Sequence, residues 1–159
     1  MPWEIEETYL VRQDLLPELP DGMLCRQGYL SLAPERIVRV RAMGGRGILT
    51  VKGRTKGAAR PEFEYAIPLQ EAEDLLATLC LRPLVEKMRH PVPYEGRMWT
   101  VDVFLGMNRG LVLAEVELVR EGEACALPPW TGRCVTGDVR FRNANLVRHP
   151  FCRWERDKG

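Results

Sequence analysis

The sequence has little net charge, few histidines and no paired cysteine motif. Its 159 residues include 23 Lys+Arg and 22 Asp+Glu, so the formal net charge is +1. Proteins that bind nucleic acid or anionic membranes usually carry a clear basic excess, so neither kind of partner is expected. The two histidines and five cysteines, with no C-x-x-C pair, suggest neither a structural zinc site nor a disulfide framework.

Long apolar runs are also lacking. The first residues, Met1 to Glu7, are acidic where a signal peptide would be basic and then apolar, and no apolar run approaches membrane-spanning length. We therefore expect a cytoplasmic protein that does not enter a membrane. With 45% hydrophobic and 28% charged residues the chain has a globular composition, and we expect one domain over residues 1–159.

Alternation with a period of two is abundant and indicates β-strands. It predicts eight strands, over residues 4–11, 28–32, 37–42, 48–52, 62–67, 85–89, 98–104 and 111–118. Strands of this length, separated by turn residues, are typical of an antiparallel barrel or sandwich. The expected class is mainly β (α+β), an eight-stranded antiparallel closed β-barrel with helices packed outside.

One segment has a helical period instead. Apolar residues recur every three or four positions from Leu69 to Cys80, with Pro68 before them and Pro83 after them. This pattern predicts a helix that packs an apolar stripe against the outside of the sheet. Residues 143–147 are a second, short helix candidate.

Five of the predicted strands carry two charges of the same sign, two residues apart. Residues i and i+2 of a strand share a face about 6.6–6.8 Å apart, and like charges on one face repel. The pairs are Glu4/Glu6, Arg39/Arg41, Glu62/Glu64, Lys87/Arg89 and Glu115/Glu117. If these faces point outward, water screens the pairs. If they converge, the acidic strands need cations and the basic strands need a polyanion.

A closed barrel favours convergence, because its interior can hold side chains or one small ligand. Oxygen ligands suit Mg²⁺ or Mn²⁺, and arginine forks suit phosphate. The candidate metal ligands are Glu4, Glu6, Asp102, Glu115 and Glu117, and the candidate phosphate ligands are Arg39, Arg41, Lys52, Lys87 and Arg89. The sequence therefore predicts a tunnel that binds a divalent cation and a polyphosphate together.

A set of ordered motifs covers nearly the whole chain. They are Glu4-Ile-Glu6, Gln27-Gly-Tyr-Leu, Arg39-Val-Arg41, Lys52-Gly, Glu62-Phe-Glu64, Lys87-Met-Arg89, Val101-Asp102-Val-Phe, Glu115-Val-Glu117 and Pro129-Trp-Thr-Gly. Together they resemble the CYTH superfamily, the triphosphate tunnel metalloenzymes, in the short bacterial form. The resemblance implies an eight-stranded tunnel barrel that binds a triphosphate with a divalent cation.

The implied activity is hydrolysis of the terminal phosphate of a small anionic substrate, chiefly inorganic tripolyphosphate. ATP and thiamine triphosphate are left open as substrates, as is a homodimer. The resemblance implies that Glu4, Glu6 and Glu117 bind metal, with Asp102 and Glu115 close by, and that the five basic residues bind phosphate. The expected catalytic residues are Glu4, Glu6 and Lys87. A second metal near Asp102 and Glu115, which we favour, or Lys87 as a neutral amine, would activate the attacking water.

Two residues depart from the family pattern. Thr8 replaces the lysine of the E-x-E-x-K signature, and Cys134 stands where a glutamate is usual. The missing lysine motivates a second hypothesis, a module that binds polyphosphate or nucleotide with weak or no turnover. A class IV adenylate cyclase is the third.

The remaining conspicuous residues are expected to be structural. We expect Cys134 to be a small buried hydrophobe, and His90 and His149, each followed by proline, to lie in turns. The four tryptophans are expected to pack in the outer core; they are Trp3, Trp99, Trp130 and Trp154.

Overall fold

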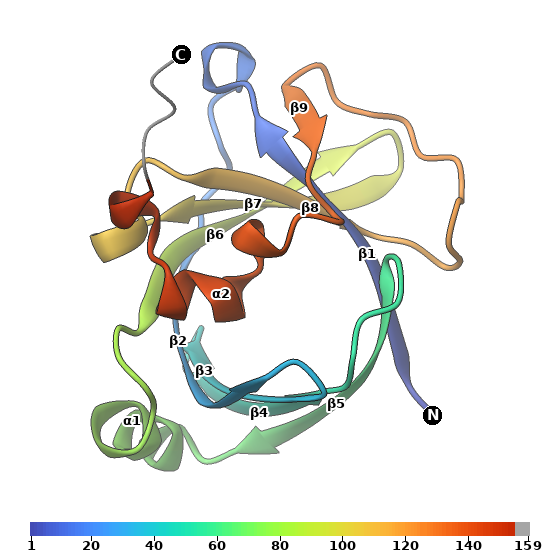
Figure 1. Cartoon of the computed structure of the whole chain (residues 1–159). Coiled ribbons are helices and arrows are strands. Elements are labelled where there is room, and N and C mark those ends of the chain that lie inside the picture. Colours follow the sequence, from blue (N-terminus) through green and yellow to red (C-terminus); the bar gives the residue numbers. More distant parts are fainter. Residues whose placement is uncertain (155–159) are drawn as a thin grey trace.

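The computed structural model describes residues 1–154 and shows a closed antiparallel β-barrel (Figure 1). Its eight strands are β1 (Trp3–Val11), β2 (Met23–Ala33), β3 (Arg36–Met43), β4 (Arg46–Lys52), β5 (Ala59–Ile67), β6 (Val85–Tyr94), β7 (Arg97–Phe104) and β8 (Val112–Glu117). They pair in the order β5-β4-β3-β2-β6-β7-β8-β1, and β1 also pairs with β5. The predicted fold class is confirmed.

Strand β1 closes the barrel because its two halves have different neighbours. Its first residues pair with β5, where Glu4 lies opposite Arg60, and residues from Glu6 onward pair with β8. A ninth strand, β9 (Thr131–Cys134), pairs with the end of β1 outside the ring. The sequence did not predict β9, because four residues are too few to show an alternation.

Two strands are longer than predicted by about five residues or more. β2 begins at Met23, and β6 continues through His90 to Tyr94. Beyond Arg89, β6 pairs with β7 alone, so Pro91 and Pro93 interrupt no ladder to a second neighbour. The prediction of a turn at His90 is therefore wrong.

The helix α1 (Leu69–Thr78) packs on the outside of β3 and β4, as predicted. Ala72 and Leu76 are buried against Val40 and Ala42. The approach is close at Gly47, where an added Cβ would lie 2.8 Å from the Cβ of Ala72. A glycine at this position therefore lets the helix reach the sheet.

The helix α2 (Asn143–Arg148) lies over the barrel interior when the molecule is viewed as in Figure 1. Leu146 and Val147 pack into a core cluster with Phe104 and Phe141. Only α1 thus fits the expectation of a helix packed outside the barrel. The short 3-10 helices are η1 (Gln13–Leu15), η2 (Gly106–Asn108), η3 (Val139–Phe141) and η4 (Phe151–Arg153), and none of the helices within residues 1–154 could cross a bilayer.

The tryptophans divide into packed and exposed residues. Trp99 and Trp130 are buried with ring centroids 5.9 Å apart, and Trp154 packs against Phe141. The packing prediction is confirmed for these three, but Trp3 is 53% exposed. Cys134 is also exposed, which contradicts its expected burial.

Candidate functional site: the barrel interior

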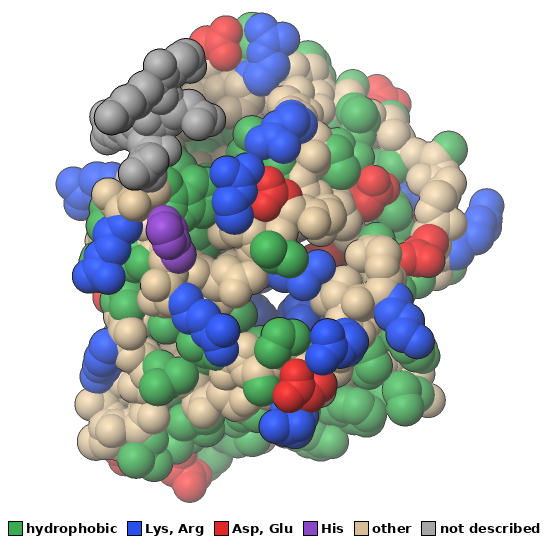
Figure 2. All heavy atoms as spheres, viewed as in Figure 1, with side chains coloured by type: hydrophobic (Ala, Val, Ile, Leu, Met, Phe, Trp, Pro, Cys, Tyr) green, Lys and Arg blue, Asp and Glu red, His purple; other side chains and the backbone are tan. Residues whose placement is uncertain are grey.

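A cavity of about 980 Å³ occupies the barrel interior. Charged side chains of both signs line it; they are Glu4, Glu6, Arg39, Arg41, Lys52, Arg54, Arg60, Glu62, Glu64, Lys87, Arg89, Glu115, Glu117, Asp138 and Arg142. Lysine and arginine side chains surround the opening at the centre of the face shown in Figure 2. The same-sign pairs therefore converge on one cavity, which removes the alternative that water screens them on an outer face.

The carboxylates of β1 and β8 form one side of this cavity. Glu6 lies directly opposite Glu117 across the two strands, and Thr8 lies opposite Glu115. Within residues 1–154, neither Glu6 nor Glu117 forms an ion pair. Burial, followed by the charges of Glu115 and Glu4, raises the pKa of Glu6 to about 8. On this side Glu115 lies 3.7 Å from Nη2 of Arg89, whereas Glu6 and Glu117 lack a basic partner among the described residues and burial favours the protonated form of Glu6 at neutral pH.

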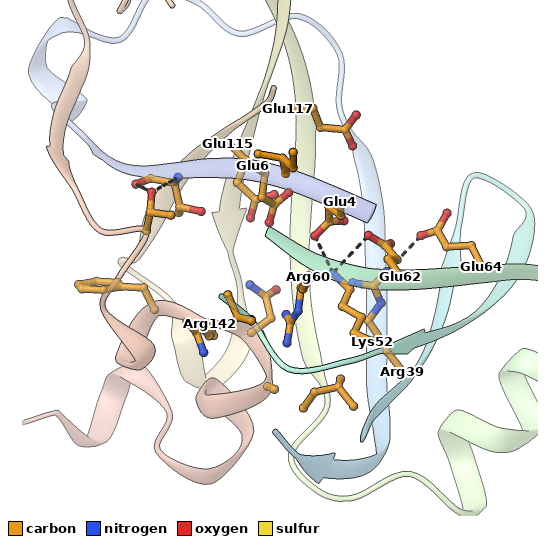
Figure 3. A pocket seen from close by; sticks show the side chains of 18 of the residues that line it. Glu4, Glu6, Arg39, Lys52, Arg60, Glu62, Glu64, Glu115, Glu117 and Arg142 are labelled. Atoms are coloured by element: carbon orange, nitrogen blue, oxygen red, sulfur yellow. Dashed lines mark hydrogen bonds and ion pairs between the residues drawn. The ribbon is translucent and has the colours of Figure 1, made fainter. Parts of the chain in front are cut away.

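Lys52 neutralises the adjoining acidic pair (Figure 3). Its Nζ lies 3.2 Å from Oε1 of Glu4 and 3.9 Å from Oε2 of Glu62. Burial opposes ionisation of Glu4, but the hydrogen bond from Glu62 and the charge of Lys52 lower its pKa to about 2. Burial and the contact with Glu4 raise the pKa of Glu62 to about 9. The two carboxyl groups thus differ in charge at neutral pH, with the proton on Glu62.

Basic residues of β3 and β6 face these acids. Arg39 donates to Oγ1 of Thr50 at 3.1 Å and lies 3.5 Å from Oε1 of Glu64. Its buried Nε has no hydrogen-bond partner among the described residues. Burial, then the charge of Arg39, lowers the pKa of Arg41. Since buried polar groups are normally satisfied, the cluster has hydrogen-bonding capacity for an anion.

Asp102 lies behind this cluster and departs from its predicted role as a metal ligand. It is opposite Arg89 in the strand register, and its two oxygens accept hydrogen bonds from that guanidinium at 2.9 and 2.8 Å. Its Oδ2 also lies 2.8 Å from Nζ of Lys87. Burial opposes the charge, but Lys87 and Arg89 hold the pKa of Asp102 below its usual range. Asp102 is therefore a counter-ion of the basic residues, and it does not line the cavity.

Arg54, which pairs with Glu35, lines the cavity and was missed at the sequence level, as were Arg60 and Arg142 (Figure 3). Arg60 shares the inward face of β5 with Glu62 and Glu64, so the same alternation would have located it. Arg142 lies in the segment between η3 and α2, where no strand period applies. Both add positive charge that the predicted set lacked.

The donor chemistry of the β1 and β8 carboxylates fits Mg²⁺ or Mn²⁺. Both ions prefer several oxygen ligands, and Glu6, Glu115 and Glu117 supply them on adjacent strands. Glu115 lies near Arg89, whereas Glu6 and Glu117 have no basic partner among the described residues. Within residues 1–154, no three acidic, histidine or cysteine side chains lie close enough together to hold a metal ion. The carboxylates repel one another in the absence of a cation. An ion at this position would offset that repulsion.

The fold and the interior define the chain as a closed β-barrel with an internal cavity of mixed charge. Residues 4–149 match the model of the CYTH domain, and the chain belongs to this family. It is 47% identical over 148 residues to an inorganic triphosphatase of Acetivibrio thermocellus, covering 93% of this chain and 95% of the relative.

A second relative and a solved structure agree with this assignment. An inorganic triphosphatase of Nitrosomonas europaea is 36% identical over 149 residues, covering 88% of this chain and 97% of the relative. The crystal structure of the inorganic triphosphatase NE1496 has a TM-score of 0.65 and 34% identity, covering 92% of this chain and 95% of that chain. The chain is therefore similar to these proteins over nearly its full length.

Proposed function

We propose that this protein hydrolyses the terminal phosphate of a triphosphate compound, above all inorganic tripolyphosphate. The observation that carries the proposal is the meeting, in one cavity, of five buried or half-buried basic residues with carboxylates that lack basic partners. The relatives named as inorganic triphosphatases, at 47% and 36% identity, support the same activity. Phosphoryl transfer depends mainly on positioning and electrostatic stabilisation, which such a cavity can supply.

The basic residues of β3, β4 and β6 would bind the anion. The free Nε of Arg39 and the remaining donors of Arg41 and Arg89 are suited to phosphate oxygens. Lys52 would exchange part of its contact with Glu4 for phosphate. We add Arg60 and Arg142 to this set, because both side chains reach the cavity in Figure 3.

Triphosphatases of this family are metal-dependent in general. We propose that Glu6, Glu115 and Glu117, with Glu4, would hold Mg²⁺ or Mn²⁺ in this chain. The ion would neutralise charge on the phosphate oxygens and polarise the bond to be broken. Asp102 is left out of this set because Arg89 and Lys87 occupy both of its oxygens.

Lys87 is expected either to act as a general base or to bind phosphate, and its surroundings bear on both roles. Burial lowers its pKa, which favours the neutral amine that a general base needs, whereas the charge of Asp102 opposes this shift. Its ammonium group has three donors, of which Asp102 and Asn143 take two. We propose that the third donates to a phosphate oxygen, so that Lys87 chiefly binds the substrate.

The proposal is tested by phosphate release from tripolyphosphate, ATP and thiamine triphosphate, each with Mg²⁺, Mn²⁺ or a chelator. The expected result is metal-dependent release that is fastest with tripolyphosphate. Formation of cyclic AMP and pyrophosphate from ATP would instead support the cyclase hypothesis. A lack of release from all three substrates, with either metal, would contradict the proposal.

A binding module without turnover is the second candidate, and Thr8 is the observation that favours it. Thr8 lines the cavity opposite Glu115, so the signature lysine would have placed a cation beside the unpaired carboxylates. Under this alternative the wild-type protein binds tripolyphosphate without releasing phosphate, and Thr8→Lys restores release. Release by the wild-type protein excludes it.

The cellular location and the oligomeric state of the protein remain predictions. We propose a cytoplasmic location, which the five free cysteines support because disulfides are rare in reducing compartments. A homodimer stays open, and light scattering of the purified protein would decide it.

A further inference from the structure

The motif Gln27-Gly-Tyr-Leu has no part in the anion or metal binding described above, although Gln27 on β2 is 0% exposed. The Oε1 atom of Gln27 accepts hydrogen bonds from Nε and Nη2 of Arg41, at 3.1 and 2.8 Å. Its Nε2 donates to the hydroxyl of Tyr29 at 3.1 Å and to Oδ1 of Asn143 at 3.0 Å. Gln27 thus contacts one phosphate-binding candidate directly.

Asn143 extends this chain of contacts to a second cation. Its Oδ1 also accepts a hydrogen bond from Nζ of Lys87 at 2.8 Å. Asn143 is the first residue of α2 and lines the cavity. One continuous network therefore joins Arg41 on β3, Gln27 on β2, Asn143 on α2 and Lys87 on β6.

The acceptors in this network are neutral, which matters for an anion site. A buried cation must have acceptors, and a carboxylate would bind it more strongly than an amide does. A carboxylate would also cancel the charge that attracts phosphate. Lys87 and Arg89 already share Asp102. Amide oxygens can fix Arg41 and Lys87 without removing any further positive charge.

We propose that Gln27 and Asn143 are positioning residues that aim Arg41 and Lys87 at a triphosphate while preserving their positive charge, and that α2 is thereby part of the site. This inference rests on the proposed function. The positioning role requires a hydrogen-bond acceptor without charge at both Gln27 and Asn143. A purely structural role requires only the acceptor, whether charged or not.

The substitution Gln27→Glu keeps the acceptor for Arg41 and adds a negative charge, and it also removes the Nε2 donor to Tyr29 and Asn143; Asn143→Asp adds the charge while keeping the Oδ1 acceptor. We expect the KM for tripolyphosphate to rise about tenfold or more, the scale of one hydrogen bond to a charged group. We expect kcat to change less, and the melting temperature of Asn143→Asp, which keeps the acceptor for Gln27 and Lys87, to stay equal or rise. Asn143→Asp should act in the same direction. The control Gln70→Glu makes the same change on the exposed surface of α1, and its KM should equal that of the wild type.

The variant Gln27→Met tests the need for an acceptor, since it removes the oxygen at similar size. We expect its KM to rise as well, now with a lower melting temperature. A wild-type KM in both Gln27→Glu and Asn143→Asp, for an active wild-type enzyme, would overturn the inference and leave the proposed function intact. If the wild type binds tripolyphosphate without turnover, the same comparison is made on the Kd from calorimetry. An unchanged Kd in both charged variants then overturns the inference.

Discussion

Charged residues form ion pairs on one side of the barrel interior, whereas two carboxyl groups on the other side have no basic partner within residues 1–154. On β6 and β7, Lys87 and Arg89 share the carboxylate of Asp102, and every member has a partner within 2.9 Å. On β1 and β8, Glu6 and Glu117 lie opposite each other, and within the described residues neither has a basic partner. Both sides arise from the same alternation of charged and apolar residues.

We interpret the paired charges as structural ion pairs and the unpaired carboxyl groups as ligand-binding groups. A buried ion pair with complete hydrogen bonds contributes to the native arrangement, and removal of one partner leaves an unpaired charge. Carboxylates that face each other without a cation destabilise the barrel instead. Such a cost is expected where binding supplies the missing charge.

Substitution of Asp102 by Asn should destabilise the protein the most. Lys87 and Arg89 would lose their shared counter-ion in a buried position, which typically costs about 3–5 kcal/mol of unfolding free energy. Urea denaturation at pH 7 measures this loss, and Asp21→Asn on the exposed surface is the control. A loss no larger than that of the control would show that the β6 and β7 side is not held by its ion pairs.

The same pair of proteins should show a characteristic pH dependence. Because the pKa of Asp102 is lowered in the folded state, its stabilising contribution is present above the unfolded value, about 3.9, and is lost as the pH falls toward the folded value. The difference in unfolding free energy between wild type and Asp102→Asn should therefore shrink below about pH 4. A constant difference between pH 7 and pH 2 would argue against this assignment.

Binding should stabilise the side whose carboxylates are unpaired. With Mg²⁺ alone at about 100 times its Kd, the unfolding free energy should rise by about 2.7 kcal/mol. Glu117→Gln should weaken that rise at the same concentrations, because it removes one of the proposed oxygen ligands, whereas Glu7→Gln, outside the cavity, should not. Thermal unfolding with Mg²⁺ and with a chelator measures the effect. An equal rise in all three proteins would contradict the proposed site.

Removal of one unpaired carboxylate should stabilise the metal-free protein slightly. Folding raises the pKa of Glu6 to about 8. Its contribution to the stability of the folded protein is therefore fully present below the pKa of the unfolded chain and is lost as the pH rises through 8. At pH 9 in chelator, Glu6→Gln should gain about 1 kcal/mol over the wild type, and at pH 5 the gain should disappear. Destabilisation at pH 9 would place Glu6 among the structural charges.

The sequence predicted which side chains face the interior better than it predicted their partners. A period of two assigns Glu6, Arg41 and Lys87 to one face regardless of which strands are neighbours. The pairing of Asp102 with Arg89 depends on the β6 and β7 register, which no local pattern specifies. Arg142 was missed for a related reason, since the segment before α2 has no strand period.

Glu6 is central to the proposed metal site, and phosphate release from tripolyphosphate tests its role most directly. Wild type, Glu6→Gln and Glu7→Gln are compared in Mg²⁺ under identical conditions, because Glu6 and Glu7 are adjacent on β1 and Glu7 lies outside the cavity. We expect Glu6→Gln to lose activity by a factor on the order of 100, the scale of several kcal/mol of metal-assisted stabilisation, while Glu7→Gln stays close to wild type. Equal rates for Glu6→Gln and the wild type would contradict the account.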